Sequence, residues 1–263
     1  MAHLCDSHCH LADPRIRNDI EPVLERAKAA GVGTIIAVGA IDSIETDRMT
    51  VEIAERHANV FAVVGVHPHD ASACDSNRLA ELRALADSDR VVGIGESGLD
   101  FHYMRSPVVD QENALRRHLE LAAAVGRPIV IHCRDAERRL VEIVREVGMP
   151  PMGGVIHCFT GDTEAAREFV ELGFFISFSG ILTFRNSAAL REVAPTIPAD
   201  RLLIETDSPY LAPEPYRGRP NEPAYIASTM ATLAKIRGIA PDDLAATLAI
   251  NTGRLFRIES RLN

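Results

Sequence analysis

Gly33-Thr34-Ile35-Ile36-Ala37-Val38-Gly39 is a nearly continuous apolar run between two glycines. A strand with one face in water alternates apolar and polar residues, whereas this run does not. It therefore predicts a strand buried on both faces, as in a parallel sheet covered by helices. The preceding segment, Ile20–Ala30, carries apolar residues at helical spacing and stops at Gly31, which predicts a helix.

The same alternation extends outward in both directions. Cys5–Leu11 predicts the opening strand, and later strands are predicted at residues 60–66, 91–95, 128–131, 153–156, 174–178 and 201–204. Helices are predicted at residues 43–57, 78–87, 110–125, 135–147, 163–172, 188–193, 224–236 and 241–256. Eight strands, each but the last promptly followed by a helix, predict a parallel sheet with right-handed crossovers. In 263 residues this favours an α/β fold with one (β/α)₈ barrel and an extra C-terminal helix, a single domain over residues 1–263.

The composition limits the classes of function. A net charge of −9 argues against a broad basic surface that coats nucleic acid, although a local positive site remains possible. Five cysteines without a C-x-x-C pair predict a reducing compartment. The sequence has neither a leader pattern nor an apolar run of membrane length, and nothing in it indicates an obligate protein partner. We therefore expect a cytoplasmic protein without a membrane partner.

Metal-ligand residues gather at the predicted strand ends. His8 and His10 lie one residue apart on the opening strand, so both imidazoles project from one face. Four later strands also end in residues of ligand type: Glu96, His132, His157 and Asp207. Parallel strands in a barrel end at the same rim, and a protein core rarely gathers such residues without a cation. These six residues therefore predict one metal site.

Six ligands exceed the needs of one open catalytic ion, so the pattern favours two divalent cations bridged by a carboxylate, with Glu96 as the bridge. Imidazole and carboxylate ligands fit Zn²⁺, Mn²⁺, Co²⁺ or Ni²⁺, and Mg²⁺ fits if oxygen ligands dominate. The identity of the metal stays open. A carboxylated lysine as bridge is excluded because Lys28 and Lys235 both fall in predicted helices.

The site would be locally positive, which suits phosphate esters. Asp207 is the expected general base, because a ligand carboxylate can also accept a proton. Glu205 shares its strand face and is the expected relay or supporting acid, although a structural pairing with an arginine is an equal alternative. Five further residues follow strand ends and are expected to contact substrate, although a solvated loop charge or a local hydrogen bond is an equal alternative for each: His67, His69, His102, Arg134 and Arg217.

The motifs in this order resemble those of the TatD family of metal-dependent deoxyribonucleases, in the wider group of metallo-hydrolase barrels. They are Asp6-Ser7-His8-Cys9-His10-Leu11, Gly65-Val66-His67-Pro68-His69, Gly95-Glu96-Ser97-Gly98-Leu99-Asp100, Ile131-His132-Cys133-Arg134-Asp135-Ala136, His157-Cys158-Phe159-Thr160-Gly161 and Glu205-Thr206-Asp207-Ser208-Pro209-Tyr210-Leu211. The resemblance implies a TIM barrel with metal ligands at the six positions given above. Family members are described as exonucleases or phosphodiesterases acting on DNA, and some act on RNA or aminoacyl-tRNA.

We therefore expect a metal-dependent deoxyribonuclease or phosphodiesterase of the 3′–5′ exonuclease type, which activates water at two divalent cations (Mg²⁺, Mn²⁺ or Zn²⁺). Its expected substrate is DNA or a short oligonucleotide, with RNA as a further possibility. Two alternatives stay open. The same centre could hydrolyse a carbonyl substrate such as a lactone, a cyclic amide or an aminoacyl-tRNA ester. The chain could also be a metal-binding or nucleic-acid-binding barrel without turnover.

Overall fold

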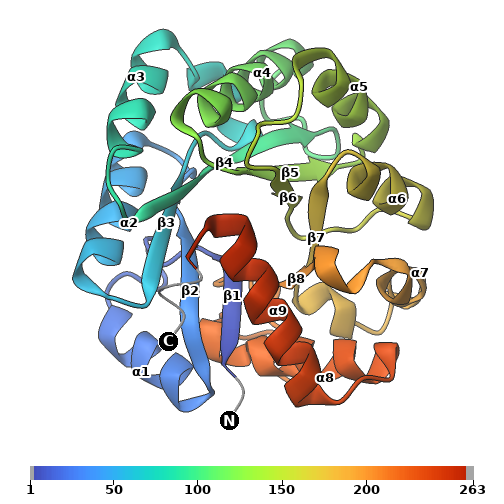
Figure 1. Cartoon of the computed structure of the whole chain (residues 1–263). Coiled ribbons are helices and arrows are strands. Elements are labelled where there is room, and N and C mark those ends of the chain that lie inside the picture. Colours follow the sequence, from blue (N-terminus) through green and yellow to red (C-terminus); the bar gives the residue numbers. More distant parts are fainter. Residues whose placement is uncertain (1–2, 259–263) are drawn as a thin grey trace.

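Eight parallel strands pair in chain order from β1 to β8 in the computed structural model, which describes residues 3–258. They are β1 (Leu4–Cys9), β2 (Val32–Val38), β3 (Val60–Val64), β4 (Val91–Asp100), β5 (Ile129–Arg134), β6 (Gly154–Ile156), β7 (Phe174–Phe178) and β8 (Leu202–Ile204). The sheet curves into a barrel with helices between the strands (Figure 1). The predicted (β/α)₈ barrel is thereby confirmed.

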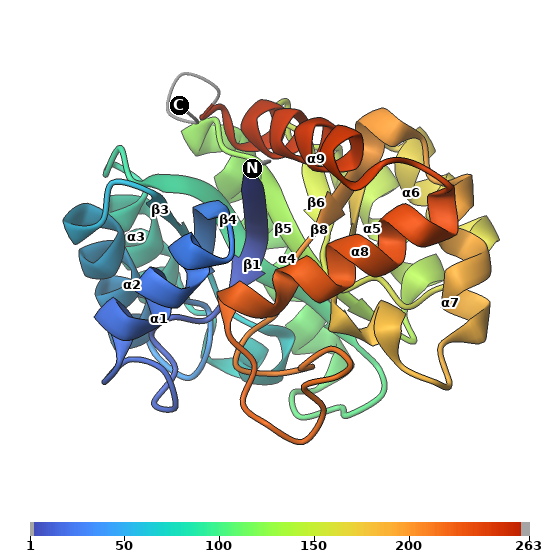
Figure 2. The same cartoon turned by 90° about the horizontal axis from the view of Figure 1, so that it is seen from below.

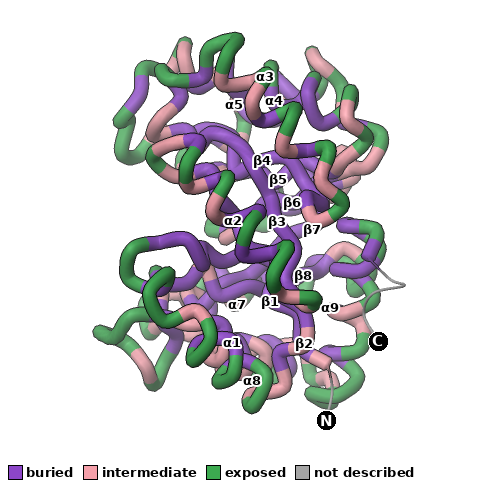
Figure 3. Tube along the Cα trace, turned by 90° about the vertical axis from the view of Figure 1, so that its left-hand side faces the viewer, coloured by how far each residue is buried: buried purple, intermediate pink, exposed green. Residues whose placement is uncertain are grey.

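Helices surround the barrel and leave their outer faces in solvent, while the strands are buried (Figure 3). They are α1 (Ile20–Ala29), α2 (Ile44–Arg56), α3 (Ser76–Leu85), α4 (Val108–Val125), α5 (Glu137–Val147), α6 (Thr163–Glu171), α7 (Ala188–Val193), α8 (Ile226–Arg237) and α9 (Pro241–Phe256). Helix α9 lies across the end of the barrel where β1 begins (Figure 2). The long loop between β8 and α8 lies at the opposite end. Within the described range no helix combines the length and the apolar character needed to cross a bilayer.

Two apolar layers follow from the alternation of side chains along each strand. One layer fills the barrel interior with residues such as Ile36, Phe61 and Val130, and the end of α9 closes it with Phe256. The other layer packs the outward residues against the helices. Burial of large side chains such as Phe61 stabilises the fold by about 1.5–3 kcal/mol each.

Side chains of β1 help to join it to β8 and so close the barrel. The Ser7 hydroxyl donates to the carbonyl oxygen of Ile204 at 2.9 Å. The buried Asp6 carboxylate accepts from the Thr206 backbone N–H at 2.8 Å and from its hydroxyl at 2.6 Å. Just beyond, the Asp207 N–H donates to the carbonyl oxygen of His8 at 2.9 Å. This seam holds the residues after β8 against the end of β1.

Strand β4 is longer than the sequence predicts, because it continues from Glu96 to Asp100 along β5. Gly98 makes this possible. It has φ +149°, and a Cβ at this position would overlap the carbonyl oxygen of His132. Only glycine therefore allows β4 to approach β5 so closely beside His132.

Candidate metal centre

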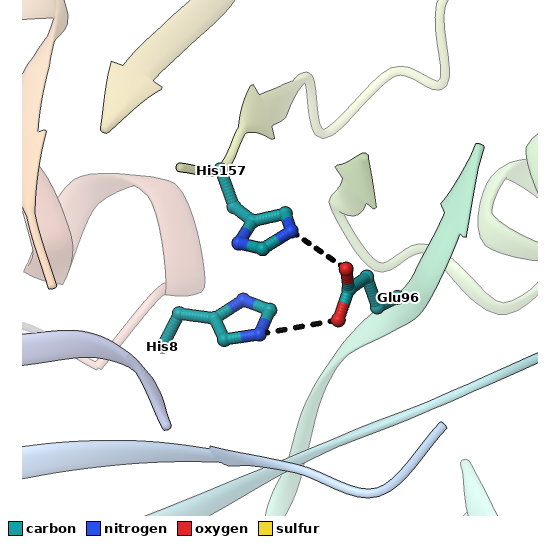
Figure 4. A group of neighbouring side chains, drawn as sticks. All are labelled: His8, Glu96 and His157. Carbon is teal, nitrogen blue, oxygen red and sulfur yellow. Dashed lines mark ion pairs between the residues drawn. The ribbon is translucent and has the colours of Figure 1, made fainter. Parts of the chain in front are cut away.

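All six residues predicted as metal ligands meet at the carboxyl end of the barrel. His8, Glu96 and His132 lie on β1, β4 and β5. The others come after strands: His10 and His157 directly follow β1 and β6, and Asp207 lies three residues beyond the end of β8. Figure 4 shows His8 and His157, from β1 and from the residue after β6, pointing toward the two oxygens of Glu96. The donor atoms fall into overlapping groups that could hold a metal ion.

The first donor group gathers His8, His10, Asp207 and one oxygen of Glu96. The Nε2 atoms of His8 and His10 lie 3.3 Å apart. Glu96 Oε2 is 3.3 Å from His8 Nε2 and 3.8 Å from His10 Nε2. Asp207 Oδ1 is 3.4 Å from His10 Nε2 and 3.9 Å from His8 Nε2. Each of these donors therefore lies within 3.9 Å of at least two others.

The second donor group uses the other oxygen of Glu96. Glu96 Oε1 lies 2.6 Å from His157 Nε2 and 2.9 Å from His132 Nδ1. These two nitrogens are 3.4 Å apart. His67 Nε2 lies 3.3 Å from the same oxygen, so a residue predicted to contact substrate is also placed among potential ligands.

These spacings fit a divalent cation. Four donors in a tetrahedron, each about 2.0–2.2 Å from a central ion, lie about 3.4 Å from one another. The five measured separations in the first group run from 3.3 to 3.9 Å. Both nitrogens of His157 also face carboxylates, Glu96 at one and Glu205 at the other. A neutral imidazole has one N–H, so one of these contacts requires a proton or a cation between the atoms.

The electrostatics of the cluster favour ionised carboxylates. Burial alone would raise the pKa of Glu96, but attraction by His157 and His67 outweighs it and holds that pKa well below its usual range. Burial also opposes ionisation of Asp207, whose pKa is nevertheless lowered, mainly by its hydrogen bond with His10. Burial lowers the pKa of His67 to about 4. Burial would also lower the pKa of His157, but attraction by Glu96 and Glu205 outweighs it and raises that pKa well above its usual value. A cation that binds there takes the place of the His157 proton.

Supporting acids fix the orientation of two ligand rings. Glu205 Oε1 lies 3.2 Å from His157 Nδ1 and accepts the backbone N–H of Cys158 at 2.7 Å. Asp100 Oδ2 lies 3.3 Å from His132 Nε2 and 2.8 Å from His69 Nε2. Each acid engages the ring nitrogen on the side away from Glu96, an arrangement typical of metal-binding histidines. Glu205 therefore stands behind His157, while the sequence did not single out Asp100 in this role.

A cavity of about 530 Å³ opens above the cluster. Three of the residues predicted to contact substrate line it, namely His67, His69 and Arg134. His102 and Arg217 are not among the described lining residues. His102 Nδ1 lies 3.0 Å from Asp135 Oδ2, and the guanidinium of Arg217 lies 3.7 Å from the ring centre of Phe184.

The cavity wall also contains residues that the sequence analysis did not identify, including Arg17, Tyr103, Arg105 and Tyr210. Tyr103 and Tyr210 are among the few large hydrophobic residues in the described chain with substantial exposure, at 53% and 37%. Tyr210 belongs to the motif Glu205–Leu211, and that motif did not mark it as a contact to substrate. Its approach to the cavity depends on the fold of a loop, which periodicity does not reveal.

A barrel whose strand ends carry histidines and carboxylates at the spacing of metal ligands defines a metal-dependent hydrolase. The family model described as TatD related DNase matches residues 5–257. The chain belongs to the TatD family.

Relatives and solved structures agree with this assignment over nearly the whole chain. The uncharacterized metal-dependent hydrolase YabD of Bacillus subtilis is 41% identical over 255 residues, covering 97% of this chain and 99% of the relative. The 3′-5′ ssDNA/RNA exonuclease TatD of Cronobacter sakazakii is 38% identical, covering 95% and 97%. The crystal structure of YjjV, a TatD homolog from Escherichia coli, has a TM-score of 0.91 at 31% identity, covering 97% and 98%.

Proposed function

We propose that this protein hydrolyses phosphodiester bonds at the 3′ end of single-stranded DNA or RNA with two divalent cations. The observation that carries the proposal is the division of Glu96 between two donor groups, with Oε2 facing His8 and Oε1 facing His132 and His157. A carboxylate in this position is suited to bridging two cations. Binuclear centres of this kind are typical of phosphatases and nucleases.

The residues divide into two ligand sets. One cation would be held by His8, His10, Glu96 and Asp207, and the other by Glu96, His132 and His157, with His67 within reach. When bound, such cations lower the pKa of water and stabilise the negative charge that develops on phosphoryl oxygens. Glu205 and Asp100 keep the rings of His157 and His132 in the orientation that presents a nitrogen to the cation.

Asp207 is the group best placed to accept the proton of the attacking water. Both oxygens of Glu96 contact imidazole nitrogens, and 3% of its side chain is exposed. Asp207 exposes 13% of its side chain and lines the cavity. Its lowered pKa keeps it ionised at neutral pH, which is the form that accepts a proton.

The relative named as a 3′-5′ ssDNA/RNA exonuclease supports the choice of nucleic acid among phosphate esters. His67, His69 and Arg134 line the same cavity and are the proposed contacts to substrate phosphates. His102 and Arg217 remain proposed contacts for a longer strand. The net charge of −9 fits a substrate held by a few phosphates at the cavity, not along a groove.

The direct test is a comparison of substrates after metal removal. Protein stripped by a chelator is reloaded with Mg²⁺, Mn²⁺ or Zn²⁺ and incubated with labelled single-stranded DNA, single-stranded RNA, a bis-nitrophenyl phosphate and a panel of lactones. Metal-dependent shortening of the oligonucleotides from the 3′ end is expected. Hydrolysis of lactones alone would assign the centre to carbonyl chemistry, and no turnover with any metal would identify a binding barrel.

Asp207→Asn tests the proton acceptor. The amide keeps an oxygen for the cation but cannot take up a proton, so turnover is expected to fall by about 10²–10⁴-fold. Asp42→Asn is the matched control, because Asp42 lines the same cavity outside the donor groups and asparagine tolerates its φ of +63°. Near-normal turnover of Asp207→Asn with full metal content would remove Asp207 from this role.

A further inference from the structure

Tyr210 forms part of the cavity wall beside the metal ligands. It lies in the loop between β8 and α8, and its ring centre is 5.9 Å from that of His10 in an edge-to-face arrangement. The side chain lines the cavity and remains 37% exposed. A large aromatic ring is therefore presented to whatever occupies the space next to the first donor group.

The Tyr210 ring is held in place by two residues of the segment after β1. Its hydroxyl donates to Asp13 Oδ2 at 3.2 Å. The guanidinium carbon of Arg15 lies 4.2 Å from the ring centre. Asp13 fixes Arg15 in turn with two hydrogen bonds of 2.9 Å, from Nε and Nη2. Arg15 therefore covers one face of the ring, and it is not among the described residues of the cavity wall, whereas Asp13 and Tyr210 are.

We propose that the cavity-facing side of Tyr210 is a stacking platform for a nucleobase next to the scissile phosphate. The inference rests on the proposed phosphodiester hydrolysis and specifies its substrate as a nucleotide with an accessible base. An aromatic ring can stack on any base, because each base presents a π-face, so the platform contributes affinity without reading sequence.

The position of the ring determines which base it can reach. His10 belongs to the first donor group, so a base on Tyr210 belongs to a nucleotide that adjoins the phosphate at the cluster. Bases inside a duplex are stacked on their neighbours and must leave that stack to reach a protein ring. The platform therefore favours single-stranded ends over paired ones.

The platform is more specific than an apolar wall. A packing residue would bury its ring, whereas Tyr210 remains 37% exposed and its hydroxyl donates to Asp13. These contacts join the segment after β1, with Asp13 and Arg15, to the loop after β8, with Tyr210, across the barrel seam. This arrangement restrains the ring before substrate arrives, which reduces the entropy lost on stacking.

A double-mutant cycle between protein and substrate tests the platform. Wild type and Tyr210→Leu are assayed on a single-stranded oligonucleotide and on copies with an abasic tetrahydrofuran residue at the 3′-terminal or the penultimate position. Loss of the ring or loss of the base is expected to lower kcat/KM by about 5–150-fold each. Loss of both the ring and the base should lower kcat/KM little more than loss of either one alone. Tyr210→Phe keeps the ring and should retain most of the preference for a base.

Tyr216→Leu is the matched control, because Tyr216 lies in the same loop with its ring 3.8 Å from that of Tyr225 and is not among the described residues of the cavity wall. Its preference for a base should equal that of wild type. If Tyr210→Leu lowered kcat/KM by the same factor on normal and abasic strands, the proposed stacking platform would be wrong. The proposed phosphodiester hydrolysis would not be affected by that result. Failure of metal-loaded wild type to cleave any oligonucleotide would overturn both.

A second readout uses wild-type protein alone and does not depend on the folding of a variant. The base analogue 2-aminopurine is placed at the terminal or penultimate position, and its fluorescence is followed by rapid mixing as metal-loaded protein binds, before the 3′ nucleotide is cleaved. Stacking on Tyr210 should quench the emission at one of the two positions. Binding without a change at either position would contradict the platform.

Discussion

The two ends of the barrel interior are built from the same strands but differ completely in character. At the amino end the inward side chains are apolar, among them Val130, Val155 and Leu203, and α9 covers them. At the carboxyl end the next inward positions are the titratable His132, His157 and Glu205. Two residues along a strand separate a sealed apolar layer from a polar cluster under an open cavity.

This contrast separates the residues that stabilise the fold from the residues that are suited to chemistry. Burial of the apolar layer stabilises the folded state by about 25 cal/mol per Å² of apolar surface. The polar cluster buries Glu96 at 2% exposure and His8 at 0%, which costs free energy unless a cation or close partners compensate. We therefore expect substitutions at the amino end to alter the free energy of unfolding and substitutions at the carboxyl end to alter metal binding and turnover.

Glu96→Ala should have the largest effect on turnover. It changes the polar cluster and leaves the apolar layer as it is. Both donor groups lose a ligand, so turnover is expected to fall by about 10³-fold or more, since metal ions supply several kcal/mol of transition-state stabilisation. The metal-free protein should also lose some stability, because the histidines that hold the pKa of Glu96 low lose their partner. Turnover, metal content by mass spectrometry and urea midpoints after chelation measure these outcomes. Retention of two metals per chain would refute the bridging role.

Phe61→Ala tests the apolar end. Phe61 is fully buried in the interior layer, and its truncation should lower the free energy of unfolding by about 3–5 kcal/mol. Turnover per folded molecule should change by less than about twofold, because no donor atom moves. Urea denaturation and active-site titration provide the measurements. A loss of metal content at unchanged stability would show that the two ends are not independent.

The strand period made the site predictable in outline. Parity places His132 two residues beyond Val130 and His157 two beyond Val155, so the inward direction of these ligands followed from the sequence. Glu96 was expected at a strand end, but β4 continues to Asp100 with an irregularity in its pairing with β5. Periodicity does not predict a bulge, and Asp100 behind His132 was not singled out for that reason.

Loop residues were less predictable because their positions depend on contacts between distant segments. Arg217 was expected at the substrate, yet its guanidinium lies over Phe184 and donates to the carbonyl oxygen of Ala212. Tyr210 reaches the cavity wall with Asp13, which is 197 residues away in sequence. No short-range pattern encodes such a meeting, so the metal ligands could be predicted better than the substrate contacts.

A pH titration of stability tests a buried histidine on one of the outer helices, away from both ends of the barrel interior. His118 on α4 is fully buried, and burial lowers its pKa to about 4. Its Nδ1 lies 2.7 Å from the carbonyl oxygen of Ala114, and its Nε2 accepts the Val66 N–H at 3.1 Å. The unfolded chain therefore binds the proton more tightly, and stability should be complete above pH ~6.5 and decline as the pH falls toward ~4.

The full loss from His118 is about 3 kcal/mol, and His118→Gln should remove this part of the acid sensitivity. The free energy of unfolding of wild type and variant is measured in urea at several pH values between about 4 and 7, with metal removed. Only the difference between the two proteins reports His118, because other buried groups also titrate. Parallel curves for wild type and variant would exclude it as a source of acid sensitivity.

Among the substitutions in the polar cluster, Asp100→Asn should have the smallest effect on turnover. It tests whether the acid behind His132 contributes to metal binding. Asparagine preserves the size of the side chain but removes the charge that faces His132 Nε2 at 3.3 Å and His69 Nε2 at 2.8 Å. The free energy of unfolding should change little, whereas metal affinity is expected to fall by about 10–100-fold, as for other acids that support a ligand histidine. Competition with a chelator measures that affinity, and excess metal should restore most of the turnover. Glu112→Gln is the control, because Glu112 pairs with Arg139 on the outer helices. If Asp100→Asn bound metal as tightly as this control, the orientation of His132 would have to come from packing, and the polar end would rely on the rigidity of the barrel beneath it.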